Sequence, residues 1–306
     1  MADLAASVLA RLRNQADASG RTFQLSLQLF CQEEFLRRLA ASDYQNKLVL
    51  KGGHLIYCLT EFSSRPTVDI DFLAQDTANT IEGLENILKR VINTPTGNDF
   101  VSYEIKRIEE ISIDKKYPGL SAILEARIKN TRTPLKIDFG FGDIVYPREQ
   151  LIEVPTQLDG FSPPLVNTYS LETVIAEKLD AILNLMEFSS RMKDYYDLYL
   201  LSATFDFDGD RLRSGLIITF DYRDRAYKQG DLTKLLAFDQ NKAMINKWMT
   251  FMKRLKLSPM QFDQAIETIG TFLTPVWDSI FMCKSLDSKW HAHTGRWKAA
   301  SENALL

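Results

Sequence analysis

The sequence predicts an α/β fold of the α+β kind, in which strands and helices alternate in the first half and helices dominate the second. Up to about residue 160, short apolar strands with alternating polar positions lie between helical stripes of leucine and isoleucine. From residue 169 onward, apolar residues recur mostly at helical spacing. We therefore predict a first domain over residues 1–160 and a helical C-terminal domain over residues 161–306, divided in the proline-rich connection around Pro163 and Pro164.

The first domain is expected to begin with two helices and one short strand. Residues 4–13 and 22–40 carry leucines every three or four positions, which is typical of helices. LVL at residues 48–50 has the length and composition of a buried strand. Two glycines follow as a turn, and residues 54–59 then form a short predicted helix.

Further strands are predicted by the alternation of apolar and polar side chains. VDIDFLA at residues 68–74 is one, and a helix over 78–92 follows it. Residues 101–113 and 120–130 resemble two strands of an antiparallel pair, split by KKYPG. PLKIDFGFGD at residues 134–143 is the next strand.

Composition indicates a globular cytoplasmic protein. Hydrophobic residues make up 45% and charged residues 25%, close to the average of soluble proteins. No apolar run has the length of a membrane span, and charges come too early at the N-terminus for a secretory signal. The three cysteines have no CxxC spacing, which favours a reducing compartment over a disulfide framework or a structural zinc site.

The net charge of −3 is unevenly distributed along the chain. Residues 211–306 hold 15 Lys/Arg against 9 Asp/Glu, a net charge of +6, whereas residues 1–210 have a net charge of −9. A basic C-terminal part beside an acidic first part is suited to a polyanionic partner.

Carboxylates on two predicted strands form a candidate metal site. Asp69 and Asp71 are one residue apart on a strand, so their side chains share one face while Ile70 and its apolar neighbours share the other. Asp138 stands likewise opposite an apolar row on its own strand. Carboxylates in this arrangement are the hard oxygen ligands that Mg²⁺ takes when it also holds phosphates. A lone DxD is also common at solvated strand edges, so the motif alone is weak.

Two inward-facing charges are predicted in the helical part. Lys178 lies in the middle of the apolar stripe that begins at Leu171, so it needs an anionic partner. Asp194 aligns with Leu198 and therefore faces inward, whereas Asp197 is expected off that line. Lys178 and Asp194 are either functional residues or a buried ion pair that locks two helices together.

Glycines and cations near the carboxylates suit a nucleoside triphosphate. Backbone N–H groups of the Gly52-Gly53 turn can bind a phosphate at the start of a helix, and Arg65 and Lys178 can balance phosphate charge. With a divalent metal, such a set supports nucleotidyl transfer to a hydroxyl group. The glycine pair is more often only a turn.

The chain resembles the AbiEii/AbiGii toxin family of nucleotidyltransferases, which includes the MenT toxins. The resemblance spans about residues 45–202 and is carried in order by KGGHLIYCLTEFSSRPTVDIDFL, KIDFGFGD, YSLETVIAEKLDAIL and SRMKDYYDLYLL. It implies the minimal nucleotidyltransferase fold of the DNA polymerase beta superfamily, a mixed sheet with flanking helices, joined to a helical domain that completes the active site. It also implies a toxin of a toxin–antitoxin system. Some members transfer nucleotides to the 3′ acceptor end of tRNA and so block aminoacylation.

Residue roles follow from the resemblance position by position. It makes Asp69 and Asp71 catalytic metal-binding carboxylates, with Asp138 as the third acidic position of the metal site. Lys178 and Asp194 are the further catalytic residues.

The predicted nucleotide-binding set consists of Lys51, Gly52, Gly53, Arg65 and Lys178, and the resemblance assigns Gly52, Gly53 and Lys178 of these. One departure concerns the glycine–serine turn of the superfamily, which is Gly52-Gly53 here, so no hydroxyl group follows the first glycine. The departure bears on nucleotide selectivity more than on catalysis.

Two basic segments of the C-terminal part are candidates for RNA binding. NKWMTFMKRLKL at residues 246–257 and KWHAHTGRWK at residues 289–298 interleave cations with aromatic residues, as phosphate contacts and base stacking require. The ordinary interpretation, favoured for the first segment, is an amphipathic helix with a solvated basic face. His54, His291 and His293 are expected to be structural or surface residues.

The sequence therefore predicts a Mg²⁺-dependent (or Mn²⁺-dependent) nucleotidyltransferase toxin that moves NMP from an NTP to an RNA acceptor, expected to be tRNA, and inhibits translation. A cognate antitoxin is the expected protein partner, and no membrane partner is expected. Two alternatives stay open: nucleotidylation of a protein, and a non-catalytic nucleotide-binding partner protein in which Lys178 and Asp194 only lock helices.

Overall fold

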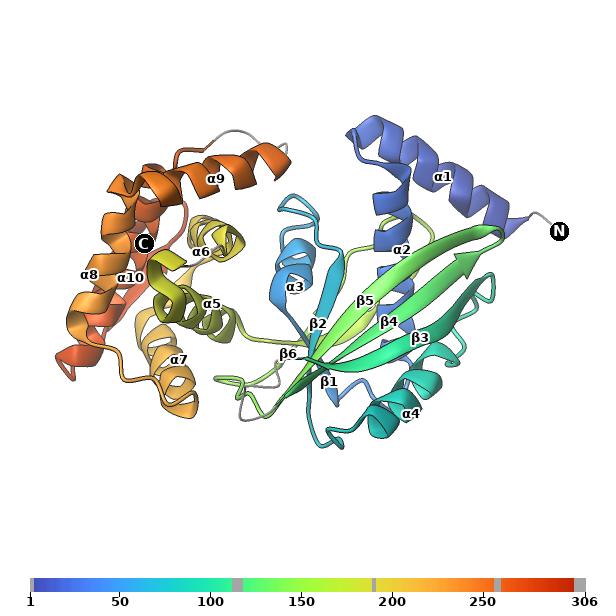
Figure 1. The fold of residues 1–306 in the computed structure, drawn as a ribbon, viewed down its shortest axis with the longest axis horizontal. Helices are drawn as coiled ribbons and strands as arrows, with labels where there is room; N and C mark the ends of the chain where they lie inside the picture. Colours follow the sequence, from blue (N-terminus) through green and yellow to red (C-terminus); the bar gives the residue numbers. More distant parts are fainter. Residues whose placement is uncertain (1–2, 112–117, 189–190, 256–259, 300–306) are drawn as a thin grey trace. The chain divides into compact units, whose positions relative to one another are not determined.

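The chain folds into two compact units, a sheet unit and a helical unit, drawn as a ribbon in Figure 1. The computed structural model describes residues 3–111, 118–188, 191–255 and 260–299. The sheet unit comprises Met1–Asp143 and Glu149–Tyr169, and the helical unit comprises Ile144–Arg148 and Ser170–Leu306. The predicted α/β class is confirmed.

A mixed sheet forms the body of the sheet unit. Its strands, within the described residues, are β1 (Leu48–Lys51), β2 (Asp69–Ala74), β3 (Val101–Ile111), β4 (Gly119–Ile128), β5 (Thr131–Phe141), β6 (Gln150–Glu153) and β7 (Leu165–Thr168). They lie in the order β3-β4-β5-β2-β1-β7-β6. β2 is parallel to β5 and β1 is parallel to β7, whereas the other neighbours are antiparallel. The predicted antiparallel pair is confirmed by β3 and β4, and most of its KKYPG connection lies outside the described residues.

In the described part of the sheet unit, the helices are α1 (Leu4–Ser19), α2 (Phe23–Ala40), α3 (Gly52–Leu59) and α4 (Ile81–Ile92). Asp3, Thr22 and Thr80 begin α1, α2 and α4, since each side chain accepts a hydrogen bond from a backbone N–H three residues on. The helices predicted over the same stretches are confirmed, and α1 runs further than predicted, to Ser19.

Helix α2 covers one face of the sheet with aromatic contacts. The ring centroid of Phe35 lies 6.3 Å from that of Phe72, which in turn lies 5.8 Å from that of Phe139. All three side chains are buried. Because side chains alternate along a strand, Asp69 and Asp71 of β2 point to the opposite face. The core thereby decides which face of the sheet carries the carboxylates.

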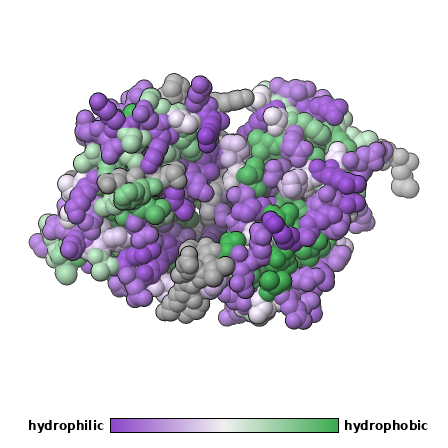
Figure 2. Space-filling view, viewed as in Figure 1, coloured by the Kyte–Doolittle hydropathy of each residue, from purple (hydrophilic) through white to green (hydrophobic). Residues whose placement is uncertain are grey.

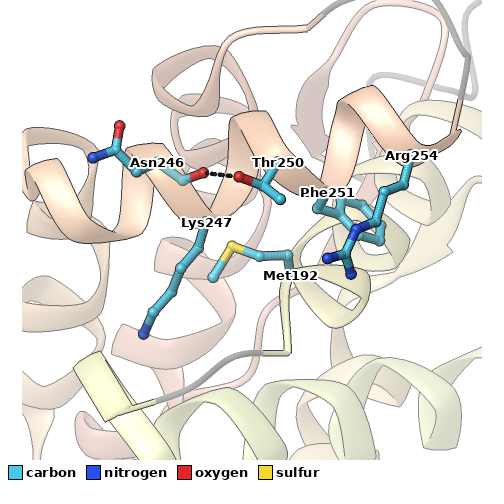
Figure 3. A pocket seen from close by; sticks show the side chains of 6 residues that line it. All are labelled: Met192, Asn246, Lys247, Thr250, Phe251 and Arg254. Atoms are coloured by element: carbon cyan, nitrogen blue, oxygen red, sulfur yellow. Dashed lines mark hydrogen bonds between the residues drawn. The ribbon is translucent and has the colours of Figure 1, made fainter.

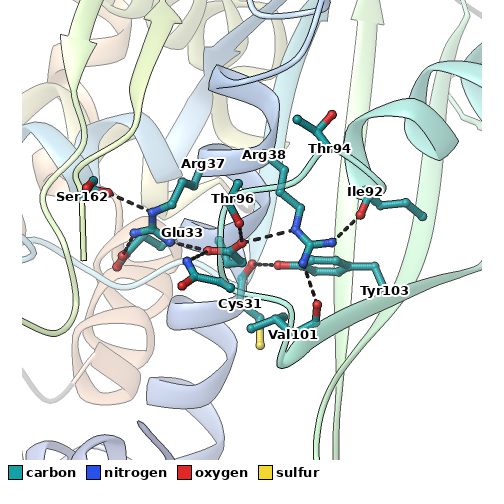
Figure 4. A network of polar contacts seen from close by, with 12 residues as sticks. Cys31, Glu33, Arg37, Arg38, Ile92, Thr94, Thr96, Val101, Tyr103 and Ser162 are labelled. Carbon is teal, nitrogen blue, oxygen red and sulfur yellow. Dashed lines mark hydrogen bonds and ion pairs between the residues drawn. The ribbon is translucent and has the colours of Figure 1, made fainter. Parts of the chain in front are cut away.

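Charged side chains of α2 form a buried polar network (Figure 4). Glu34 accepts from Arg37 at 2.5 Å and from Arg38 at 3.2 Å, and both arginines continue to backbone carbonyls. Arg38 donates to the carbonyl of Val101 at 2.6 Å and also to that of Ile92. The other members are Glu33, Thr96, Asn98 and the carbonyl of Ser162. The network ties α2 to the end of α4 and the start of β3.

The helical unit consists of short helices around a central one. Its described elements are α5 (Leu171–Leu185), α6 (Met192–Thr204), α7 (Gly209–Tyr222), α8 (Gln229–Leu236), α9 (Lys242–Leu255), α10 (Phe262–Phe281), two 3-10 turns (Met186–Phe188 and Ala237–Gln240), and the strands β8 (Phe207–Asp208), β9 (Ser288–His291) and β10 (Arg296–Ala299). α10 contributes many of the buried apolar side chains, among them Ile269, Phe272 and Val276. The helical prediction is confirmed, but the β9–β10 hairpin was not foreseen.

The tryptophans of this hairpin belong to the core. Trp290 is fully buried, with its ring 5.0 Å from Phe272, and its indole N–H donates to the carbonyl of Ser202 at 2.6 Å. Trp297 stacks on Phe272 at 5.9 Å and donates to that residue's carbonyl. The prediction that aromatic residues of segment 289–298 stack on RNA bases is therefore wrong for Trp290. Strand alternation places both tryptophans on the inner face and Lys289 and Lys298 on the outer face.

The surface of both units is mainly hydrophilic where Figure 2 shows it, with smaller hydrophobic areas in between. Throughout the part of the chain that the structure describes, none of the helices is both long enough and apolar enough to cross a membrane.

Breaking the α2 network should strongly destabilise the protein. We expect Arg38→Met to lower the free energy of unfolding by about 3–5 kcal/mol, because it removes one of the two buried cations that compensate Glu34 and takes the donor from the buried carbonyls of Ile92 and Val101. Lys89→Met is the matched control, since Lys89 pairs with Glu85 on the exposed side of α4. Such exposed pairs contribute about 0–1 kcal/mol. Urea unfolding followed by circular dichroism measures both, and equal losses would contradict the prediction.

Candidate active site

The strand carboxylates meet in one row across the sheet. In the parallel β2–β5 pair, Asp71 lies opposite Asp138, and Asp69 lies opposite Lys136. β1 places Lys51 opposite Asp71, and β4 places Ser121 opposite Asp138. Because directly paired residues share a face, the carboxylate face of the sheet holds these side chains together. The structure thus brings the predicted residues Asp69, Asp71 and Asp138 onto neighbouring strands.

Asp138 is already held by two side chains. Its carboxylate accepts from Ser121 Oγ at 2.6 Å and from Lys136 Nζ at 2.7 Å. The pKa of Lys136 is raised, mainly by this hydrogen bond to Asp138 and further by the charges of Asp138, Asp69 and Asp71. Lys136 therefore supplies positive charge to a row of carboxylates that would otherwise repel one another. Neither Lys136 nor Ser121 was singled out from the sequence, although the KID motif contains the lysine.

The donor set fits a divalent cation at Asp69 and Asp71. Both are partly exposed carboxylates on one face of a strand anchored in the core. Asp138 is a third carboxylate in the same row, bound in the structure by Ser121 and Lys136. Among the residues that the structure describes, no group of three or more His, Cys, Asp or Glu side chains is already gathered closely enough to hold a metal ion. The assignment of the three aspartates as metal ligands stays a prediction.

The Gly52-Gly53 turn lies directly against the site. Gly52 has φ +71°, and a Cβ atom there would lie 2.2 Å from Oδ2 of Asp71. A Cβ on Gly53 would lie 3.0 Å from a guanidinium nitrogen of Arg65. Only glycine leaves room for both side chains and tolerates the backbone conformation at Gly52. The structure therefore brings the predicted nucleotide-binding residues Gly52, Gly53 and Arg65 together beside Asp71.

Lys51 has partners that the sequence did not reveal. Its ammonium donates to Asp143 Oδ2 at 2.9 Å and to Tyr169 Oη at 3.2 Å, and it lies 5.0 Å from the centre of the Tyr169 ring. A Cβ on Gly140 would lie 3.5 Å from the same ammonium. Asp143 ends the FGFGD segment, and its position close to Asp138 in the sequence could have indicated that it lies near the site. Nothing in the sequence around Tyr169 indicated its contact with Lys51.

In the helical unit, Lys178 lies between two carboxylates. Its ammonium is 3.1 Å from Asp194 Oδ1 and 2.6 Å from Asp197 Oδ2, and Arg191 donates to Asp194 at 2.5 Å. Asp197 is completely buried, so the expectation that it lies off the inward line is wrong. Three residues on a helix turn by about 300°, which leaves Asp197 only about 60° from Asp194.

The charges of this cluster compensate one another. Burial alone would raise the pKa of Asp194, but Lys178 and Arg191 outweigh that effect, and its pKa lies below the usual value. The carboxylate is therefore ionised at neutral pH. The geometry supports the ion-pair lock between α5 and α6, and a catalytic role of Lys178 and Asp194 stays a prediction.

The histidines are structural or surface residues, as predicted. His54 is buried in α3, and its Nδ1 has no hydrogen-bond partner. Burial lowers the pKa of His54 to about 4, so this imidazole is neutral at pH 7. His291 lies near Asp206, with 3.7 Å between Nδ1 and Oδ2, and His293 is exposed.

A mixed sheet with aspartates beside a glycine turn is the arrangement expected of a nucleotidyltransferase, and comparison with known proteins supports this class. A family model described as nucleotidyl transferase AbiEii toxin, type IV toxin–antitoxin system, matches residues 34–268. The match covers more than half of the chain, so the protein belongs to the AbiEii family of nucleotidyl transferase toxins. The predicted family and the predicted type of enzyme are confirmed.

Two solved structures from Helicobacter pylori are similar to this chain. A protein described there as a candidate nucleotidyltransferase is 15% identical with a TM-score of 0.50, over 84% of this chain and 99% of that chain. JHP933 is 15% identical with a TM-score of 0.49, over 83% of this chain and 94% of that chain. The first likeness supports the fold alone. No curated protein matches the chain in sequence.

Gly52→Ala tests the contact between the glycine turn and Asp71. The added Cβ displaces the Asp71 carboxylate, so we expect nucleotidyl transfer to fall at least about 100-fold, in the range seen when a catalytic group is lost. Gly97→Ala is the control, because Gly97 also has positive φ but its Cβ would meet no atom within 4 Å. Both variants should lose about 1–2 kcal/mol of stability from backbone strain. A comparable loss of activity in Gly97→Ala would count against the prediction.

The lowered pKa of His54 should make the free energy of unfolding depend on pH. Because its pKa in the folded protein is lowered to about 4 from the ordinary 6.5, it contributes stability above pH 6.5 that is lost as the pH falls towards 4. We expect wild type to lose about 2 kcal/mol more than His54→Leu between pH 7 and pH 5. Urea unfolding at the two pH values measures this difference, with His293→Leu as an exposed control. Parallel losses in wild type and His54→Leu would show that His54 does not titrate in this way.

Proposed function

We propose that this nucleotidyltransferase moves a nucleoside monophosphate from an NTP to the 3′ end of tRNA, with Mg²⁺ or Mn²⁺ as the metal, and thereby inhibits translation in the cytoplasm. The observation that carries the proposal is the placement of Asp69 and Asp71 on one sheet face beside the Gly52-Gly53 turn. The family adds a toxin–antitoxin context, which implies an antitoxin partner.

The metal would be held by carboxylate oxygens of Asp69 and Asp71, with Asp138 as the third ligand. When bound, a divalent cation stabilises the charge of the triphosphate and of the attacking oxygen. Gly52 leaves the space that the Asp71 carboxylate needs. Lys136 would then give up Asp138, since one carboxylate oxygen cannot serve both cations fully.

Cations near the turn would bind the triphosphate. Arg65 lies close to Gly53, so its guanidinium and the backbone N–H groups of the turn could bind the same phosphates. Lys51 is held nearby by Asp143 and Tyr169. We further propose that Lys178 contacts the triphosphate, with Asp194 orienting its ammonium. In this assignment residues 1–160 form the nucleotidyltransferase domain, and residues 161–306 complete its active site.

The reaction is a substitution at the α-phosphorus. The oxygen of the acceptor hydroxyl bonds to that phosphorus, the bond to the bridging oxygen breaks, and pyrophosphate leaves while the hydroxyl proton passes to solvent. An RNA acceptor is supported by the resemblance of the motifs to MenT toxins and by the net charge of +6 over residues 211–306. The outer face of the β9–β10 hairpin carries part of this charge at Lys289 and Lys298.

Incubation with each of the four radiolabelled NTPs and total tRNA, in Mg²⁺ or Mn²⁺, tests the proposed function. We expect one or more nucleotides to label the RNA fraction, at a position that 3′-end mapping identifies. Label on polypeptide instead would establish protein nucleotidylation. The absence of label on either fraction with any nucleotide would contradict the proposal.

Asp69→Asn tests the metal site. The change keeps the size of the side chain but removes a charged oxygen ligand, so we expect nucleotidyl transfer and toxicity to fall at least about 100-fold. Folding should be unaffected or slightly improved, because repulsion with Asp71 is reduced. Asp43→Asn, at an exposed aspartate of the same unit, is the control. A strongly lowered melting temperature of Asp69→Asn would favour a structural role instead.

A further inference from the structure

A groove in the helical unit lies beside the Lys178 cluster and has no role in the mechanism above. It has a volume of about 360 Å³ and lies between the start of α6 and one side of α9 (Figure 3). Its lining residues are Met192, Asn246, Lys247, Thr250, Phe251 and Arg254. Met192 directly follows Arg191, which binds Asp194, so the groove adjoins the buried ion cluster within the same unit.

The groove uses a face of α9 distinct from the one that packs into the core. Met244, Trp248 and Met252 are the buried stripe of this helix. Lys247, Phe251 and Arg254 recur at intervals of four and three residues, so they share another face. Figure 3 shows the side chains of Lys247 and Arg254 on either side of Met192. α9 is therefore an amphipathic helix, as predicted, and part of its polar side lines the groove.

The floor of the groove is formed by apolar side chains that pack on the core of the helical unit. Met192 is 2% exposed, and the half-buried ring of Phe251 lies 6.0 Å from Tyr196 and 5.9 Å from Trp248. These contacts hold the Phe251 ring in place while part of it faces the groove. A supported aromatic ring is the kind of surface on which a nucleobase stacks.

The rim of the groove is cationic at both ends. Lys247 and Arg254 are seven residues apart on α9, which corresponds to about 10 Å along the helix axis. Among the described residues that line the groove none is acidic, and Asn246 and Thr250 between the cations are polar. Two cations separated by an apolar floor match a nucleic-acid strand, in which phosphates alternate with bases, better than they match a uniformly charged acidic segment.

We propose that this groove binds a single-stranded segment of the RNA acceptor, with phosphates at Lys247 and Arg254 and a base on Phe251. The inference rests on the proposed function in taking the acceptor to be RNA, and it adds where the helical unit contacts that RNA. The groove is then a binding site for the acceptor and not a catalytic site.

Binding of a fluorescein-labelled single-stranded RNA of 12 nucleotides, followed by anisotropy without NTP or divalent metal, tests the groove. Arg254→Gln should weaken binding at least about 5-fold, within the range for a lost phosphate contact, and lower the salt slope by about 0.7. Lys253→Gln is the matched control: it removes the same charge from the neighbouring exposed residue, which does not line the groove. It should change affinity less than 2-fold. Equal effects of the two variants, or no RNA binding by wild type, would overturn the proposal.

Phe251→Leu separates stacking from charge while keeping an apolar side chain in the floor. It should weaken RNA binding about 5-fold or more through lost base stacking, without changing the salt slope. Unchanged binding by this variant would overturn the placement of a base on the ring. Polyglutamate is the competitor that represents an acidic protein. If it displaces the RNA as well as unlabelled polyuridylate does at equal charge, the groove is an acidic-protein site and the proposal is wrong.

The binding assay tests the groove and the tRNA-labelling assay tests the proposed function, so either proposal can be contradicted without the other. If wild type labels tRNA but Arg254→Gln binds RNA like Lys253→Gln, the groove proposal is wrong and the proposed function stands. If no tRNA is labelled but Arg254→Gln binds RNA less tightly than Lys253→Gln, the proposed acceptor is wrong and the groove remains an RNA-binding site.

Discussion

The parallel register of β2 and β5 is the constraint on which the candidate active site depends. It sets Asp71 opposite Asp138, and side chains alternate along both strands. A slip of one residue would turn the carboxylates toward α2 and expose the apolar row, at a large cost in buried charge and lost packing. Phe72 prevents such a slip because it is buried between Phe35 and Phe139. The hydrophobic core on one face thereby positions the chemistry on the other.

Gathering like charges on one face requires compensation, and nearby cations provide it. Lys136 holds Asp138, and Lys51 lies in the same row but is directed to Asp143 and Tyr169. Each of these cations is bound to a neutralising partner in the protein alone. These ion pairs compensate the carboxylates in the protein alone. A metal ion bound to Asp138 would have to compete with Lys136 for the carboxylate oxygens.

In the helical unit a buried cation also compensates carboxylates, and there the pairing joins two helices. Lys178 is enclosed by Asp194 and Asp197, so one buried ammonium joins α5 to α6 and compensates two carboxylates. Removing one partner of such a cluster is strongly destabilising, so the loss of activity of a Lys178 variant does not by itself separate catalysis from stability. Arg254, by contrast, is exposed on a helix whose core face is formed by other residues. Its substitution should therefore leave the fold intact and report on the groove.

The sequence by itself determined the α+β class, most helices and strands, the shared face of Asp69 and Asp71, and the family, because periodicity and short motifs are local properties of the chain. It also indicated that Lys178 is buried with a carboxylate. Only the tertiary structure decided which distant groups meet: Asp143 on Lys51, and Asp197 on Lys178. It also placed Trp290 in the core, where the pattern of its segment had suggested an RNA contact. The partners in these pairs are separated along the chain, Lys51 and Asp143 by 92 positions, and their geometry depends on strand order and helix packing that no local pattern encodes.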